Sequence, residues 1–357
     1  MANKPREKKK AGGKKKADAG FFRRHQLVLL LGAATVAALC VVAAVFGLRR
    51  YDGAETWLTI PSGATAESVR DSLRTRLGTV EGNRVYMLWR LAGGSPARAR
   101  GRYRVPHGQF SWRTARNLRS GLQTPVKITW TDVRTMEQLA ARVSAGMEFT
   151  ADEFLEAADS VLSAEGYAKH EYPAAFIPDS YEFYATSSAA TVVRRLLSYR
   201  NRFWNAERIA GAKALGLTPV EAATVASIVE EESAKAEERP VIARLYLNRL
   251  DKGMPLQADP TVKFATGDFA LRRITGKHLA TDSPFNTYQH KGLPPGPIRI
   301  ASKQGLEAVL GAPQHKYIYM CAREDFSGFH NFSTDYAEHQ RNAARYQAEL
   351  DRLGIKH

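Results

Sequence analysis

The sequence predicts an α+β protein with a single N-terminal transmembrane helix, a small α+β subdomain and then a larger mixed α+β domain. Residues 26–48 form an uncharged apolar run, and later short alternating segments are interspersed with longer segments of helical periodicity. At 357 residues the chain is also too long for one average domain. We therefore expect a basic tail (residues 1–24), a transmembrane helix (25–50), a subdomain (56–131) and a second domain (132–357).

The apolar run is long enough to cross a membrane. As a helix, its 23 residues would be roughly 35 Å long, against about 30 Å for a hydrocarbon core. A cleaved signal peptide is the rival interpretation, but its apolar region is typically about 7–15 residues. We therefore expect an uncleaved single span, with everything after Arg50 outside the membrane.

The tail before the span carries ten Lys or Arg against two carboxylates, Glu7 and Asp18. This excess of positive charge is half of the chain's formal net charge of +16. By the positive-inside rule this tail stays in the cytoplasm. A nucleic-acid-binding tail is an alternative, but next to a span these lysines more simply set orientation and contact anionic lipid. We expect no nucleic-acid partner.

Cysteine and metal motifs are sparse. Cys40 lies in the span and Cys321 stands alone outside it, so the outer part has no partner for an intramolecular disulfide. Neither a CxxC pair nor an HExxH helix occurs, and we expect no metal. We also expect no organic cofactor.

In the subdomain, short strands alternate with amphipathic helices. Helical spacing of Val69, Leu73 and Leu77 marks the first helix, and glycines close the later ones. The expected order is a strand (57–60), a helix (66–77), a second helix (about 84–92), a strand (101–105), a helix (111–120) and a strand (126–130).

The second domain is predicted to be mostly helical, with one hairpin near its end. Aromatic residues crowd 172–185, a loop or short hairpin, and residues 317–333 read as a β-hairpin with its turn at 324–328. Helical periodicity predicts helical segments over 132–165, one long helix over 191–215, and helices over 219–235 and about 237–252.

The helix that begins at Pro219 carries the most informative pattern. Thr218 and Glu221 have the spacing of a capping box, and the helix ends in three glutamates. At about 100° per residue, Glu232 projects from the middle of the apolar stripe. A carboxylate there is desolvated, which raises its pKa and suits a general acid.

The plainer alternative is that the helix frays and Glu232 reaches solvent. On the helical wheel, Glu230 and Glu231 fall outside the apolar stripe, so we interpret them as a solvated rim, with Glu230 a lesser candidate for the site. Amide, hydroxyl and aromatic side chains in later loops make a plausible sugar-binding lining, although each such residue is more often a turn or core residue: Gln257, Asn286, Tyr288 and Asn331.

Several long segments resemble one known family. SIVEEES, NRLDKGMPLQADPTV, FNTYQHKGLPPGPI and the FHNFSTDYAEH ending occur in the order and spacing of the YceG-like endolytic murein transglycosylases (MltG). The resemblance runs from about Leu58 to the C-terminus. It implies a single-pass protein of the cell inner (plasma) membrane, with a LysM-like subdomain over 56–131 and a periplasmic YceG-like catalytic domain over 132–357.

The resemblance also implies a reaction. Such enzymes cleave the β-1,4 bond between N-acetylmuramic acid and N-acetylglucosamine in nascent peptidoglycan, leave 1,6-anhydro ends and help terminate glycan elongation. Their catalytic Glu precedes Ser or Thr, as Glu232 precedes Ser233 here. Glu232 would therefore be the single acid. By motif position and polarity, the candidates for holding the sugar and its developing charge are Gln257, Asp259, Asn286 and Tyr288, with Asn331 as a further substrate-binding residue.

The sequence departs from the family pattern at two places. A Glu-Gly pair is replaced by TDVR at 131–134, and EEES stands where many members have EKET, which we expect to raise the pKa of Glu232 further. The alternative function is a non-catalytic, membrane-anchored glycan-binding scaffold for peptidoglycan synthases. A pure binder, however, gains nothing from a costly buried carboxylate.

Overall fold

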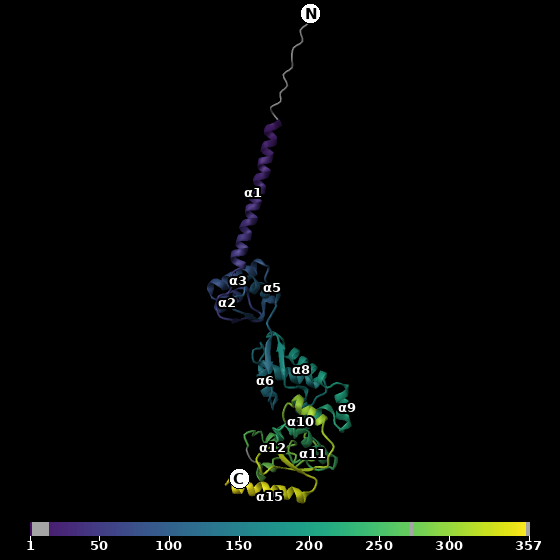
Figure 1. The fold of residues 1–357 in the computed structure, drawn as a ribbon. Coiled ribbons are helices and arrows are strands. Elements are labelled where there is room, and N and C mark those ends of the chain that lie inside the picture. Colours follow the sequence, from purple (N-terminus) through teal and green to yellow (C-terminus); the bar gives the residue numbers. More distant parts are fainter. Residues whose placement is uncertain (2–13, 272–273, 355–357) are drawn as a thin grey trace. The chain divides into compact units, whose positions relative to one another are not determined.

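The computed structural model describes residue 1, residues 14–271 and residues 274–354. It confirms the mixed α+β class with one long N-terminal helix (Figure 1). The chain divides into two compact units, Met1–Thr124 and Pro125–His357. Residues 2–13, half of the predicted basic tail, lie outside the described residues, and the first helix begins within the tail, at Lys14.

The first unit joins the N-terminal helix to a small α+β fold. An 18-residue window of that helix, His25–Val42, is long and apolar enough to span a membrane. Leu58, Leu73, Val85, Trp89 and Leu118 are fully buried in the core of the unit. The two strands pair antiparallel, with Leu58 opposite Tyr103. The elements are α1 (Lys14–Gly47), β1 (Thr56–Ile60), α2 (Ala66–Leu77), α3 (Thr79–Leu91), α4 (Pro96–Ala99), β2 (Gly101–Val105) and α5 (Ser111–Ser120).

The second unit starts with a two-stranded sheet and the helices packed around it. Its elements are β3 (Val126–Thr129), α6 (Met136–Ser144), α7 (Ala151–Ala164), the 3-10 helix η1 (Lys169–Ala175), β4 (Ser180–Phe183) and α8 (Ala189–Phe203). The two strands pair antiparallel, with Ile128 opposite Tyr181. Trp130 stacks on Tyr181 in this core, at 4.7 Å between ring centroids.

This pairing corrects two expectations. The strand predicted at 126–130 was placed in the subdomain ending at 131, but it pairs within the second unit, and the units divide at Thr124. Residues 172–185 do not form a hairpin of their own, because the partner of β4 is β3, some fifty residues earlier in the chain. Such non-local pairing leaves no local sequence signal.

The rest of the second unit surrounds α10 (Pro219–Glu232). Its other elements are α9 (Ala206–Ala214), α11 (Arg239–Asp251), α12 (Asp259–Thr266), α13 (Gly276–Leu279), α14 (Lys303–Leu310), β5 (Tyr319–Ala322), β6 (His330–Ser333) and α15 (Tyr336–Arg352). Helices α9, α11, α12, α14 and η1 all contact α10. The predicted hairpin near the end is confirmed, with Cys321 opposite Asn331.

Two helix boundaries differ from the prediction. The single helix expected over 191–215 is two helices, because Asn205 caps α9 by accepting a hydrogen bond from Arg208 N at 2.9 Å. Helix α10 ends at Glu232, three residues before the predicted end, because Ser233 has extended backbone angles. This early end places Glu232 at the C-terminus of the helix.

Candidate active site

Helix α10 is the element that positions the site. Thr218 Oγ1 accepts from Glu221 N at 3.2 Å and Glu221 Oε2 accepts from Thr218 N at 2.7 Å, so the predicted capping box forms. The residues from Ala222 to Glu230 are buried in succession. A helix buried on all sides holds its last residue in a fixed place, so Glu232 has little freedom to fray into solvent.

Glu232 lines a cavity of about 210 Å³ at the end of α10. Its Oε2 accepts a hydrogen bond from Tyr246 Oη on α11, at 3.1 Å. The side chain keeps part of its surface open to the cavity, but protein atoms surround the carboxyl group. This desolvation, with a smaller contribution from the nearby Asp259, raises the pKa of Glu232 to about 7. The carboxyl group is therefore partly protonated near neutral pH.

Three of the predicted sugar-binding residues line the same cavity. Gln257, Asp259 and Tyr288 come together there. Tyr288 Oη donates to Asp259 Oδ1 at 2.7 Å, and burial raises the pKa of Tyr288. Gln257 has a φ of 50° in the left-handed region, and its N–H donates to Thr287 O at 3.1 Å. The three residues thus form a polar wall facing Glu232.

Glu232 and Asp259 also line a second hollow. This hollow measures about 460 Å³ and is bounded further by Glu231, Pro260, Lys263, Ile274 and Tyr346. The two carboxyl groups therefore lie between the two hollows. An acid in this position can reach a bond that joins two sugar units, one in each hollow.

The interpretation of Glu230 as a solvated rim residue is wrong. Glu230 is buried, and it accepts hydrogen bonds from Ser302 N, at 2.9 Å, and from Ser302 Oγ at the N-terminus of α14. Arg239 and Arg299 lie 3.7 and 3.9 Å from its carboxylate oxygens. Gly305 makes room for it, because a Cβ there would lie 2.6 Å from the Glu230 carboxyl carbon.

Glu231 is also held by hydrogen bonds to arginines. It accepts a bidentate pair of bonds from Arg134, at 3.2 and 3.0 Å, and a third from Arg299 Nη1 at 2.8 Å. The helical wheel missed this because it assumed one apolar face, whereas α10 is packed all round. The two neighbouring glutamates are paired with arginines, so the expectation that they raise the pKa of Glu232 is also wrong. Burial and Asp259 are the causes.

A buried carboxylate–imidazole pair on the far wall of the cavity was not predicted from the sequence. His330 on β6 lines the cavity, and its Nδ1 lies 3.0 Å from Oε2 of the buried Glu238. Glu238 Oε1 also accepts the His330 N–H at 2.7 Å. The carboxylate therefore fixes the ring. The prediction chose Asn331, the next residue, whose side chain points to the opposite face of the strand.

Asn331 and Asn286 do not line the cavity. Asn331 Nδ2 donates to Glu324 Oε2 at 3.1 Å. Asn286 is fully buried, and its Nδ2 donates to Leu279 O and Thr281 O at 3.0 and 2.8 Å. Asn286 Oδ1 accepts from Tyr288 N at 3.1 Å. Asn286 thus holds the loop that carries Tyr288, and the Asn331 amide is bonded to Glu324.

Arg249 on α11 is a second residue that the sequence reasoning missed. It lines the cavity and is buried, and its guanidinium donates to Ile318 O and Leu256 O, both at 2.7 Å. Burial lowers the pKa of Arg249. Its bonds run to backbone carbonyls, and no acidic residue of the described part of the chain forms an ion pair with it, so it can stabilise a nearby carboxylate. Among residues 14–271 and 274–354, no group of three or more His, Cys, Asp or Glu could hold a metal.

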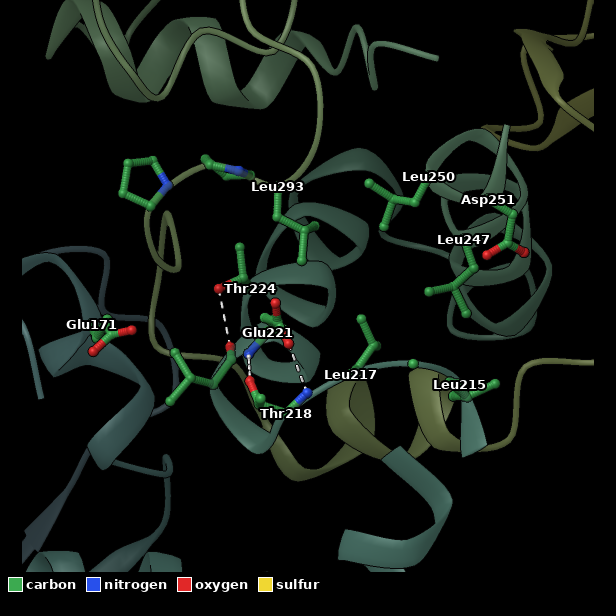
Figure 2. Close-up of a pocket in the computed structure, with 14 residues that line it drawn as sticks. Glu171, Leu215, Leu217, Thr218, Glu221, Thr224, Leu247, Leu250, Asp251 and Leu293 are labelled. Carbon is green, nitrogen blue, oxygen red and sulfur yellow. Dashed lines mark hydrogen bonds between the residues drawn. The ribbon is translucent and has the colours of Figure 1, made fainter. Parts of the chain in front are cut away.

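A larger hollow, about 620 Å³, lies at the other end of α10 (Figure 2). Its three carboxylates already have partners: Glu221 in the capping box, Glu171 with Ala168 N, and Asp251 with Arg244. Apolar residues such as Leu217, Leu247 and Leu293 complete its lining. Glu232, the carboxyl group whose pKa is raised to about 7, does not line this hollow.

The family model that describes the YceG-like family matches residues 58–345, which is most of the chain. The chain belongs to the YceG-like family. A crystal structure of a yceG-like protein from Listeria monocytogenes has a TM-score of 0.53 to this chain at 23% identity. The alignment covers 80% of this chain and 98% of that one. At this identity the likeness establishes the shared fold alone.

Two curated relatives are named endolytic murein transglycosylase. The one from Bacillus subtilis is 41% identical over 123 residues, which are 34% of this chain and 33% of that protein. The one from Streptococcus pneumoniae strain D39 is 33% identical over 138 residues, 38% of this chain and 25% of that protein. The matched segments thus span a third and a quarter of the two relatives' lengths.

Proposed function

We propose that this YceG-like protein is a peptidoglycan lytic transglycosylase that uses Glu232 as its single acid. The observation that carries the proposal is a carboxyl group whose pKa is raised to about 7 between two hollows. The names of the two curated relatives support the same substrate class. The bond cleaved is the β-1,4 linkage between N-acetylmuramic acid and N-acetylglucosamine.

In the first step, protonated Glu232 donates its proton to the glycosidic oxygen while the bond from that oxygen to C1 breaks. Tyr246 holds Oε2, and in the described part of the chain no hydrogen bond engages Oε1, so Oε1 is the oxygen that faces substrate. Positive charge develops on the muramyl ring in this step. The carboxylate of Asp259, held by Tyr288, is placed to stabilise that charge.

In the second step, the Glu232 carboxylate takes the proton of the muramyl C6 hydroxyl. The C6 oxygen forms a bond to C1, which gives the 1,6-anhydro end, and Glu232 regains the proton it donated. No water is consumed, and no second carboxylate is needed as a nucleophile or base, as it is in ordinary glycosidases. Arg249 and Tyr246 stabilise the intermediate carboxylate between the steps.

Glu230 and Glu231 position the acid. Their arginine and serine partners fix the last turn of α10 against α14 and residue 134, and so aim Glu232 into the cavity. We assign to Gln257 the role of binding substrate hydroxyls. The fixed imidazole of His330 would orient the acetamido group or the C6 hydroxyl group of the substrate.

We further propose that α1 anchors the enzyme as a single span in the cell inner membrane, with the tail cytoplasmic and both folded units extracytoplasmic. The apolar window His25–Val42 and the ten basic residues before it support this orientation. A LysM-like role for the first fold, cleavage of nascent strands and association with peptidoglycan synthases remain part of this proposal.

The competing function is a non-catalytic glycan-binding scaffold. The raised pKa of Glu232 favours the enzyme, since a binder has no use for a buried proton donor. Mass spectrometry of glycan strands incubated with the full chain tests the two. Anhydromuramyl ends support the enzyme, whereas retained binding without cleavage supports the scaffold.

A further inference from the structure

We propose that the fold of the first unit lies on the surface of the membrane and binds anionic phospholipid through an exposed face of α3 and α5. The face consists of the α3 stripe, defined as Val80, Met87 and Leu91, and of exposed side chains on α5, Trp112 with Arg113, Arg116 and Arg119. This interaction surface goes beyond the lytic activity, and it rests on α1 being a membrane span.

The α3 stripe is apolar but unusually exposed. Val80, Met87 and Leu91 are 74%, 50% and 79% exposed. Successive residues of a helix are rotated by about 100°, so these three lie within roughly 40° of one another. The opposite face of α3 is buried, with Val85 and Trp89 in the core of the unit. Packing inside the unit therefore leaves the stripe without a partner.

The two helices that carry this face lie next to α1. Both α3 and α5 contact α1. Ser111, the first residue of α5, donates to Arg49 O from its N–H and its Oγ, both at 2.9 Å. Tyr51 N donates to Gln109 O at 2.8 Å. These bonds fix the fold to Arg49 and Tyr51, two and four residues after the end of α1, where a spanning chain leaves the leaflet.

Helix α5 supplies the side chains typical of a membrane interface. Trp112 is 39% exposed at the end of α5 that is bonded to Arg49, and the guanidinium of Arg116 lies 5.2 Å from its ring centroid. Arg113, Arg116 and Arg119 are exposed on the same helix, whereas Ala115 and Leu118 are buried. Tryptophan prefers the headgroup level of a bilayer, and arginine pairs with phosphate.

The net charge of the extracytoplasmic chain is concentrated in this unit. Residues 49–124 contain fourteen arginines, no lysine and five carboxylates, a formal excess of nine positive charges. Residues 125–357 contain 28 Lys or Arg against 29 Asp or Glu, so they are close to neutral. A cationic fold bonded to the end of a span matches the negative potential of an anionic leaflet.

The occupant that fits best is phospholipid, because the α3 stripe needs an apolar partner as well as an anionic one. A glycan strand could pair with the arginines but offers little to three aliphatic side chains in a row. Headgroups and the first methylenes of acyl chains supply both. Glycan is therefore the competing outcome of the test.

The test uses the full chain in nanodiscs of phosphatidylcholine mixed with phosphatidylglycerol. Cys40 and Cys321 are replaced by Ala, and Met87→Cys carries a spin label. The matched control is a label at Thr59→Cys, which is exposed on the outer side of β1, away from the core residues Leu58 and Ile60. Collision rates with oxygen, which concentrates in lipid, and with a nickel chelate, which stays in water, report the depth of each label.

We expect the ratio of oxygen to nickel collisions to be several-fold higher at position 87 than at position 59, and to fall when Arg116 and Arg119 are changed to Glu. Equal ratios at the two positions would overturn the proposal, as would protection of position 87 that appears only after glycan strands are added. Thermal unfolding checks that every variant folds. Lytic products measured on the same nanodiscs keep a failure of the enzymatic proposal separate from a failure of this one.

Discussion

Tyr246 and Glu232 are joined by a hydrogen bond of 3.1 Å from the phenol Oη on α11 to the carboxyl Oε2 at the end of α10. This bond favours the ionised carboxyl group and so opposes the burial that raises its pKa. The pKa of about 7 is thus the balance of opposing causes. An acid that must donate a proton and then recover one near neutral pH needs such a balance.

Removing the phenol is the first test of this balance. Tyr246→Phe should raise the pKa of Glu232, because the carboxylate loses the hydrogen bond that stabilises it. The basic limb of the pH–rate profile should move upward by about one unit or less, the size of one hydrogen bond to a charged group. Tyr319→Phe, on β5, is a control with the same chemical change. An unmoved or lowered limb in Tyr246→Phe would contradict the assignment.

Removing the second carboxylate should have the opposite effect on the pH profile. The charge of Asp259 raises the pKa of Glu232, so Asp259→Asn should move the basic limb to lower pH. It should also lower kcat by about 10²-fold, because the developing positive charge loses its nearest carboxylate. Tyr288→Phe, which keeps that carboxylate, should lower kcat by a smaller factor. A full-rate Asp259→Asn enzyme would show that Asp259 does not act in the reaction.

Glu230 should matter for stability. Glu230→Gln leaves the nearby Arg239 and Arg299 without that charge and weakens the bonds from Ser302. We expect the free energy of unfolding to fall by about 2–4 kcal/mol, as for a broken buried ion pair. Glu156→Gln, exposed on α7, is the matched control and should change it by no more than about 0.5 kcal/mol. Urea unfolding of both variants measures the difference, and equal stabilities would contradict the account.

The raised pKa also predicts how stability depends on pH. Glu232 has a higher pKa in the folded chain than when unfolded, so its contribution to stability is present below about pH 4.5 and is lost as pH rises to about 7. Glu232→Gln should escape this loss and be more stable than wild type by about 2–3 kcal/mol at pH 8. The two proteins should differ little at pH 4. A gap that is the same at both pH values would contradict the raised pKa.

Local signals in the sequence predicted the start of α10 and the desolvated position of Glu232 on it. The capping box at Thr218 forms as expected, and Gln257, Asp259 and Tyr288 face the residue that the helical wheel selected. The partners of that residue were not predictable in the same way. Tyr246 comes from the next helix and His330 from a strand almost a hundred residues later, and only the tertiary fold brings them to one cavity.

The failures have definite physical causes. The helical-wheel prediction assumed that α10 is a surface helix with one apolar side, and it therefore placed Glu230 in solvent. In the structure, α14 covers the side of α10 that carries Glu230, and the N-terminus of α14 binds the Glu230 carboxylate. Asn331 was chosen in place of His330 because composition does not fix which face of a strand turns inward. The strand at Val126 was assigned to the wrong unit because its partner, Phe183, lies far along the chain.

The most direct test of the central claim is the product analysis of Glu232→Gln beside wild type, with Glu231→Gln as a neighbouring control. Purified glycan strands are incubated with each full-length protein, and mass spectrometry identifies the new chain ends. The account predicts 1,6-anhydromuramyl ends from wild type and from any Glu231→Gln that remains folded, and none from Glu232→Gln, although that variant still binds glycan. Anhydro ends from Glu232→Gln at the wild-type yield, or reducing ends from the wild type, would contradict it.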